Sequence, residues 1–306
     1  GGESFPSEIL SAYKAKREQE KVIIINGFDR ISGPAVVNTS DRAGFDLSQD
    51  PGVPYISNIS FCGAQTGFDR TQAGKEGKAP GPGIDGLRVH RRRGQPRSCD
   101  LAVDYPFIHG KAIQAAGKYS FVSCSDEAVE NGLVTLEDYP VVDYILGLEK
   151  EDPANKAYYK TFSSAMQRIM TSYCQSGGNL FVSGAYVGSD MSGTQGNREF
   201  TEKILKYGYQ SSLTDKSSNQ IKGLGRTITI PRLPNENSYA VPAADCIVPV
   251  DTAFPVFTYA PGNQSAGIAY KGNYRTFVLG FPFESIQSEA DRATIMAGIL
   301  GFFTQK

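Results

Sequence analysis

Short apolar strands alternate with segments of helical periodicity along most of this chain, and this alternation limits the fold more than any other feature. Val22 to Ile25 is an unbroken β-branched run, as expected for a strand buried on both faces of a parallel sheet. Glycines follow several strands and helices, which is typical of βαβ units with right-handed crossovers. The sequence predicts strands at 21–29, 119–124, 141–146, 179–183 and 275–280, and helices at 107–117, 157–176, 197–207 and 289–303.

Two segments depart from this alternation. Residues 223–275 contain short alternating runs such as Thr227 to Ile230, which predict antiparallel strands appended to the sheet. Residues 30–110 are rich in Gly, Pro, Ser, Asp and Asn, and so long a stretch without periodicity is unusual within a domain. We expect an ordered insertion at 30–110, because aromatic and aliphatic residues such as Tyr55 and Phe61 can anchor it.

Charge and hydropathy disfavour two classes of partner. The 306 residues carry 31 basic and 32 acidic side chains, a formal net charge of −1, which does not favour nucleic acid or an anionic membrane. No apolar run approaches the roughly 20 residues that span a bilayer, so no membrane span is predicted. The basic run His90 to Arg93 reads as a solvated loop, with a specific anion or glycan contact as the alternative.

Neither a metal nor a phosphate cofactor is predicted. The five cysteines form no CxxC pair and the chain has only two histidines, His90 and His109, so a zinc site is not expected. A disulfide between Cys62 and Cys99 would cross-link the insertion if the protein resides in an oxidising compartment. No GxGxxG or Walker-type loop follows the first strand, and the loop there lacks the composition that FMN requires.

Polar residues follow several of the predicted strands. In an open parallel sheet, ligands bind at the carboxyl ends of the strands. Turn and capping roles are the alternative for each of these residues. The predicted ligand-binding residues are Asp29, Arg30, Asp126, Glu127, Tyr186, Asp190 and Glu284.

Four residues are candidates for catalysis: Ser183, Glu284, His109 and Asp126. Ser183 lacks the Gly-x-Ser-x-Gly pattern of a nucleophile elbow, and only His90 or His109 could act as its base. Packing or capping at the start of a helix is the alternative role for His109. A pair of rim carboxylates can hydrolyse glycosides or bind a hard cation, but can equally cap helices and form salt bridges.

Two stretches resemble the class I glutamine amidotransferase-like domains. Residues 177–184, Gly-Gly-Asn-Leu-Phe-Val-Ser-Gly, resemble the strand that enters that family's nucleophile elbow, and residues 280–285 resemble its motif near the chain end. The similarity spans roughly 21–30 and 119–303. It implies a three-layer α/β sandwich around a mostly parallel, flavodoxin-like sheet, formed by one domain over 21–306.

The sequence departs from this family where its chemistry would be. Ser183, Gly184 or Ala185 occupies the elbow, where active members carry Cys, and Glu284 stands where they carry His. Glutamine amidotransferase activity is therefore not expected. The chain is more similar to the family's ThuA-like and trimerisation-type members, which lack that activity.

The N-terminal residues resemble a different module. Residues 1–14 look like the closing strand of a fibronectin type III module, followed by a charged linker at 15–20. Together with residues 45–54, this pattern resembles secreted bacterial multidomain proteins labelled xanthan lyase or N-acetylmuramoyl-L-alanine amidase. The resemblance implies a periplasmic or extracellular, cell-surface location and contact with other domains of the same parent chain.

Three functions remain open on the sequence. The first is a non-catalytic accessory domain of a polysaccharide- or cell-wall-active protein that binds a glycan or peptidoglycan fragment. The second is a hydrolase that uses carboxylates at the carboxyl edge, or Ser183 with His109. The third is a structural or oligomerising module.

Overall fold

The computed structural model describes residues 10–28, 105–151, 160–213, 219–231, 238, 241 and 243–305, together with the backbone of two short strands at 35–38 and 43–46. Asp29, Arg30, His90, and the proposed Cys62–Cys99 pair lie outside these residues, as does most of the 30–110 insertion. Of the expected fibronectin-like tail at 1–14, residues 10–14 are described, and Ala12 and Tyr13 form a short strand.

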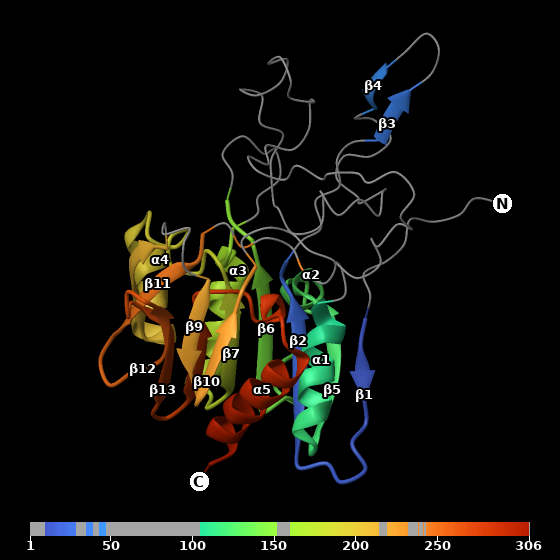
Figure 1. The fold of residues 1–306 in the computed structure, drawn as a ribbon. Helices are drawn as coiled ribbons and strands as arrows, with labels where there is room; N and C mark the ends of the chain where they lie inside the picture. The colour runs from blue at the N-terminus through green and yellow to red at the C-terminus, as the bar shows by residue number, and fades with distance from the viewer. Residues whose placement is uncertain are drawn as a thin grey trace, which may run out of the picture.

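The centre of the molecule is a mixed sheet of 10 strands in the order β1-β5-β2-β6-β7-β14-β13-β12-β9-β10 (Figure 1). Five adjacent strands are parallel: β5 (Tyr119–Ser125), β2 (Glu20–Asn26), β6 (Val141–Gly147), β7 (Asn179–Gly184) and β14 (Arg275–Leu279). The other five are antiparallel to their neighbours: β1 (Ala12–Tyr13), β13 (Ser265–Lys271), β12 (Phe254–Ala260), β9 (Gln220–Gly223) and β10 (Arg226–Thr229). Two separate two-stranded antiparallel sheets pair β8 (Tyr207–Ser212) with β11 (Asp245–Pro249), and β3 (Ala35–Asn38) with β4 (Ala43–Asp46).

This topology corrects the expected fold class. A mostly parallel, flavodoxin-like three-layer sandwich with a few added strands is wrong, because antiparallel strands make up half of the main sheet rather than a small appendage. The reason is local: the turns between β12, β13 and β14 are short, and such turns return the chain alongside the strand it has just left. The parallel half keeps the predicted order of strands and intervening helices.

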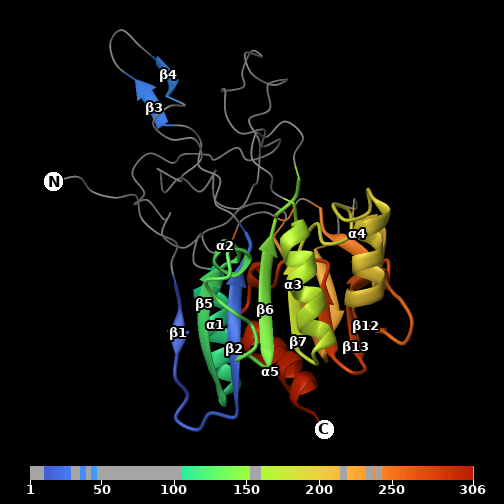
Figure 2. The same cartoon turned by 180° about the vertical axis from the view of Figure 1, so that it is seen from behind.

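Helices cover both faces of the parallel half. On one face lie α1 (Tyr105–Ala116) and α5 (Glu289–Thr304), in front of the sheet in Figure 1; on the other lie α2 (Asp126–Glu130) and α3 (Ser164–Gln175), in front in Figure 2. Near α3, α4 (Gln195–Phe200) continues as the π-helix η3 (Thr201–Leu205). A single 3₁₀ turn, η4 (Phe283–Ser285), connects β14 to α5. No helix in the described part of the chain is long and apolar enough to cross a membrane.

N-terminal caps set where these helices begin. Ser163 accepts a hydrogen bond from the backbone N–H of Met166 and Ser288 from that of Asp291, so that α3 and α5 start directly after them. Helix α3 therefore begins at Ser164, seven residues later than the periodicity of 157–176 predicts.

The core divides into two clusters, one on each face of the sheet. Side chains of successive strand residues point to opposite faces, so Phe181 joins the cluster beneath α1 and α5, while Leu180 and Val182 join the cluster beneath α3. Aromatic rings dominate the first cluster: Phe181, Phe257, Phe277, Phe281 and Phe283 are all buried. Burying one such ring stabilises the fold by about 1.5–3 kcal/mol.

Candidate functional site

A buried site with three ionisable side chains lies beneath α1, where three segments far apart in the sequence meet. His109 of α1 lies with Nδ1 2.8 Å from Oδ2 of Asp143 on β6, and with Nε2 3.3 Å from Oε2 of Glu284 in η4. The side chains are 0%, 2% and 1% exposed, respectively. We call these residues the buried ionic cluster.

The local sequence explains how each member reaches this point. Asp143 shares its face of β6 with Val141 and Ile145, whereas Val142 and Tyr144 face the α3 side. His109 lies on the buried stripe of α1 together with Tyr105, Ala112 and Ile113.

Aromatic rings enclose the imidazole. Its centroid is 4.7 Å from that of Phe283 and 6.2 Å from that of Phe181. Because Phe283 directly precedes Glu284, the same short turn supplies both the ring that packs on His109 and the carboxylate that faces it.

Electrostatics hold His109 in its charged form. Burial by itself would lower the pKa of His109, but the charge and hydrogen bond of Asp143, followed by those of Glu284, outweigh this and raise the pKa to about 9. Both ring nitrogens of the imidazolium then act as donors to carboxylates. An imidazolium in this position cannot accept a proton.

Ser183 shares this face of the sheet, but His109 does not contact it. Ser183 lies near the end of β7, beside Ile145 of β6 and Leu279 of β14, on the same face as Phe181. It is fully buried, and its Oγ has no hydrogen-bond partner among the described residues. Because both nitrogens of His109 face carboxylates, the ring does not present a base to Ser183.

Asp143 was missed in the sequence. It stands within Val141 to Leu146, where the unbroken apolar pattern identified a strand and nothing else. Its presence in an otherwise apolar strand could have indicated the site, because a lone carboxylate in a fully buried strand needs a charged or hydrogen-bonding partner.

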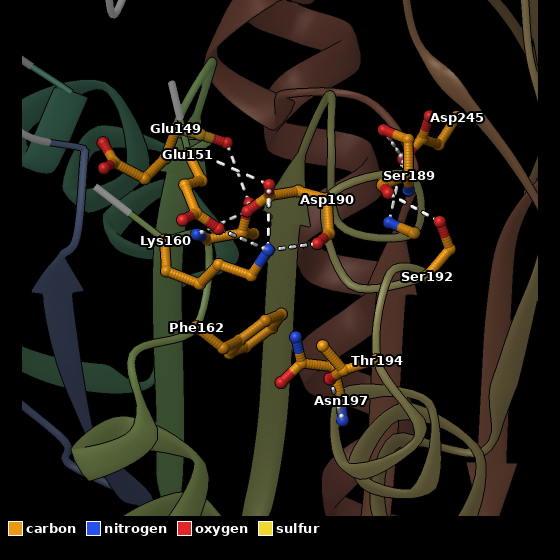
Figure 3. Close-up of polar contacts among 12 residues, drawn as sticks. Glu149, Glu151, Lys160, Phe162, Ser189, Asp190, Ser192, Thr194, Asn197 and Asp245 are labelled. Atoms are coloured by element: carbon orange, nitrogen blue, oxygen red, sulfur yellow. Dashed lines mark hydrogen bonds and ion pairs between the residues drawn. The ribbon is translucent and has the colours of Figure 1, made fainter. Parts of the chain in front are cut away.

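At the carboxyl edge of β6 and β7, Asp190 is the centre of a second polar network (Figure 3). Its Oδ1 accepts hydrogen bonds from Lys160 Nζ at 3.1 Å and from the backbone N–H of Glu151 at 3.2 Å. Its Oδ2 accepts from the backbone N–H and the hydroxyl of Thr161, at 2.9 and 2.8 Å. Asp190 therefore fastens the segment after β6 to the turn after β7.

Asp245, next to this network, also connects two segments through hydrogen bonds to its carboxylate (Figure 3). Its Oδ2 accepts from the backbone N–H groups of Gly188 and Ser189, at 2.8 and 2.6 Å, and from the Ser189 hydroxyl at 3.0 Å, while Ser212 donates to Oδ1 at 3.0 Å. Burial raises the pKa of Asp245 to about 6, although these donors oppose the rise. The carboxylate joins β11 to the turn after β7.

The remaining predicted residues do not gather at one place. Asp126 accepts a hydrogen bond from Tyr144 at 3.4 Å, on the face opposite to the buried ionic cluster, and Glu127 is exposed on α2. Tyr186 is largely buried, which raises its pKa to about 12, and Lys150 Nζ lies 4.9 Å from the centre of its ring. Of the predicted set, Tyr186 and Asp190 lie near each other in the chain at the carboxyl edge.

These residues form no metal centre, and one groove in the described part of the chain lies away from them. The described part of the chain contains no group of three or more His, Cys, Asp and Glu side chains arranged to hold a metal ion. A shallow groove of about 390 Å³ lies instead at the amino end of β2, between Lys14, Lys21 and Tyr139. It is at the opposite end of the strands from Ser183, so it has no part in the chemistry described above.

Comparisons with known proteins do not assign the chain to a family. No family model and no curated protein matches it. Among solved structures, a catalytic mutant of the GH42 β-galactosidase Gan42B from G. stearothermophilus has a TM-score of 0.45 at 10% identity, over 70% of this chain and 28% of that one. The exo-β-1,4-mannosidase Op5Man5 from Opitutaceae bacterium strain TAV5 has a TM-score of 0.41 at 10% identity, over 71% and 33%.

A third similar structure comes from a protein of a different kind. The N-terminal domain of mmIFT52 has a TM-score of 0.42 at 15% identity, over 64% of this chain and 89% of that domain. The chain spans about a third or less of the two glycosidases. Likenesses this distant support no conclusion about activity.

Proposed function

We propose that this chain is a non-catalytic accessory domain of a secreted polysaccharide- or cell-wall-active protein, and that it binds a glycan or peptidoglycan fragment at the carboxyl edge of its parallel strands. The non-catalytic part of the proposal rests on one observation: both ring nitrogens of His109 contact carboxylates, one of Asp143 and one of Glu284.

A histidine that acts as a general base needs a free nitrogen lone pair and a pKa near the working pH. His109 has hydrogen-bonding carboxylates at both nitrogens and a pKa raised to about 9. Its geometry is that of a structural cation that binds α1 to β6 and η4. A role in holding the fold together accounts for all three members of the buried ionic cluster.

The carboxyl edge offers groups suited to binding a sugar. Tyr186 provides a partly buried aromatic side chain whose ring lies beneath Lys150, and Asp190, four residues further along the chain, forms a nearly buried ion pair with Lys160. Aromatic faces pack on the apolar faces of sugar rings, and a few fixed polar groups orient a ligand. The proposed ligand is therefore a neutral or acidic saccharide unit.

The cellular setting is proposed on the sequence alone. The stretches at 1–14 and 45–54 resemble secreted proteins labelled xanthan lyase or N-acetylmuramoyl-L-alanine amidase. A periplasmic or extracellular location and contacts with other domains of such a parent follow from that resemblance. Catalysis by the parent would then belong to a different domain.

A ligand screen tests this proposal. The unfolding temperature of the chain is measured with xanthan fragments, muropeptides and divalent cations, and each mixture is assayed for product. A ligand at 100 times its Kd stabilises the fold by about 2.7 kcal/mol. We expect one saccharide class to stabilise the chain without turnover, and Tyr186→Ala to reduce that ligand-dependent shift.

The matched control is Glu137→Ala, an exposed substitution in the loop before β6, at the other end of the strands. It should leave the ligand-dependent shift unchanged. Product release that is lost in Tyr186→Ala would replace the proposal with a hydrolase. Absence of any stabilising ligand, for the chain and for its full-length parent, would refute the binding role and favour a structural module.

A further inference from the structure

We propose that an internal water molecule binds between Asp143 Oδ1 and Ser183 Oγ, beneath α1, and completes the polar contacts of the buried ionic cluster. The site is independent of the proposed ligand-binding edge. It is assigned from two buried oxygen atoms that have no protein partner among the described residues.

The two side chains are diagonal neighbours on one face of the sheet. Asp143 of β6 is in register with Phe181 of β7, and Ile145 is in register with Ser183. Side chains two residues apart on a strand share a face, so Asp143, Phe181, Ile145 and Ser183 all face α1. With neighbouring strands about 4.8 Å apart and a rise of about 3.3 Å per residue, the Cα atoms of Asp143 and Ser183 are roughly 8 Å apart.

This separation suits a bridging molecule rather than a direct bond. The structure shows Asp143 bonded through Oδ2 to His109 and shows no hydrogen bond from Oδ1 to Ser183. One water that forms two hydrogen bonds of about 2.8 Å joins oxygens roughly 4.5–5.5 Å apart. A diagonal pair with a short serine and a longer aspartate fits that span.

Both oxygens are buried away from bulk solvent. Counted over the whole residue, Asp143 is 1% exposed and Ser183 is 0% exposed, and both side chains face the packed interior beneath α1. Buried polar atoms are satisfied by protein groups or by ordered water in nearly all native structures. A water can donate one hydrogen to the carboxylate and bond the serine hydroxyl with its remaining capacity.

Neighbouring groups favour water over a cation. His109, which is held in its charged form, is bonded to the other oxygen of the same carboxylate, so a metal ion at Oδ1 would meet a positive charge close by. Asn26 lies in the same row of the sheet as Ile145 and Ser183, and its buried amide adds a polar group to this patch. A neutral molecule that both donates and accepts hydrogen bonds fits this mixture best.

The test uses the wild-type chain. Crystals that diffract well enough to show ordered water are grown in sodium acetate without chloride. Parallel crystals are soaked in thallium(I) acetate, because Tl⁺ replaces Na⁺ or K⁺ and scatters anomalously. We expect a density peak about 2.7–3.2 Å from both Asp143 Oδ1 and Ser183 Oγ. We expect no anomalous peak at that position.

Solution measurements provide a second readout. Water–protein cross-relaxation in NMR should show a long-lived water at the Ser183 amide. The signal should weaken in Ser183→Ala and persist in Ser285→Ala, the control at another fully buried serine, whose hydroxyl bonds the Pro282 carbonyl instead. A direct Asp143–Ser183 hydrogen bond, a dry site or an anomalous thallium peak would each overturn the proposal.

Discussion

His109 Nδ1 lies 2.8 Å from Asp143 Oδ2 and His109 Nε2 lies 3.3 Å from Glu284 Oε2, so one imidazole ring joins residues that are 34 and 175 positions away along the chain. The ring thereby links a helix, a central strand and the turn after the last parallel strand. Removing a member of a buried charged cluster is costly because the partners stay behind without compensation.

His109→Ala should therefore destabilise the fold by about 3–5 kcal/mol, since it leaves two carboxylates buried without their cation. Lys111→Ala is the control: Lys111 is on the same helix and pairs with Glu289 at the surface, where solvent screens the ion pair and its removal should change stability little. Urea denaturation measures both. Equal stability of the two variants would show that the buried ionic cluster does not support the fold.

The two carboxylates should differ in their contributions. Asp143→Asn should cost about 2–3 kcal/mol and Glu284→Gln about 1 kcal/mol, because the hydrogen bond to Asp143 is shorter and its charge acts most strongly on His109. Both variants keep an acceptor oxygen of similar shape. Chemical denaturation of the pair checks the order, and a larger loss in Glu284→Gln would contradict it.

Stability should fall as the pH rises from about 6.5 to about 9. The pKa of His109 is raised in the folded state from its ordinary 6.5 to about 9, so the folded chain binds a proton more tightly than the unfolded chain. The contribution is complete below pH 6.5 and is lost as the pH passes through 9. Denaturation midpoints across this range should decline in the wild type by an amount on the order of a few kcal/mol, and the decline should be much smaller in His109→Gln. A flat wild-type profile would contradict a charged His109.

Asp245 should also be important for stability. Asp245→Ala leaves the N–H groups of Gly188 and Ser189 without their acceptor, and should cost about 2–4 kcal/mol. Asp251→Ala is the control, because Asp251 is 58% exposed and pairs with Lys206 at the surface. Hydrogen exchange of the Gly188 and Ser189 amides provides a local readout: exchange should accelerate in Asp245→Ala alone.

The sequence predicted the parallel half of the sheet well, because its signals are local. The run Val22 to Ile25 and the apolar run from Val141 identify β2 and β6, and Gly177-Gly178 marks the end of α3. The extent of the antiparallel half could not be read in the same way. The strands β1, β9 and β10 have four residues or fewer. The pairing of all five depends on contacts between segments whose order in the sheet no local pattern specifies.

The candidate site was predicted only in part. Strand ends do share an edge, but the segments that follow them place their side chains on different faces of the sheet. Glu284 of η4 joins His109 on one face, and Asp126 of α2 meets Tyr144 on the other. His109 was considered as a packed or catalytic residue, but its partner Asp143 was hidden inside an apolar strand. Only the three-dimensional arrangement shows that both nitrogens of the ring are engaged.

The protonation state of His109 tests the central claim most directly. The chain has only two histidines, so NMR of the imidazole nitrogens, with His90→Gln to assign the second ring, follows His109 through a pH titration. We predict an imidazolium with both N–H groups protonated at pH 7, which titrates near pH 9. A neutral ring at pH 7, titrating at or below 6.5, would contradict the structural role of the buried ionic cluster and restore His109 as a candidate base.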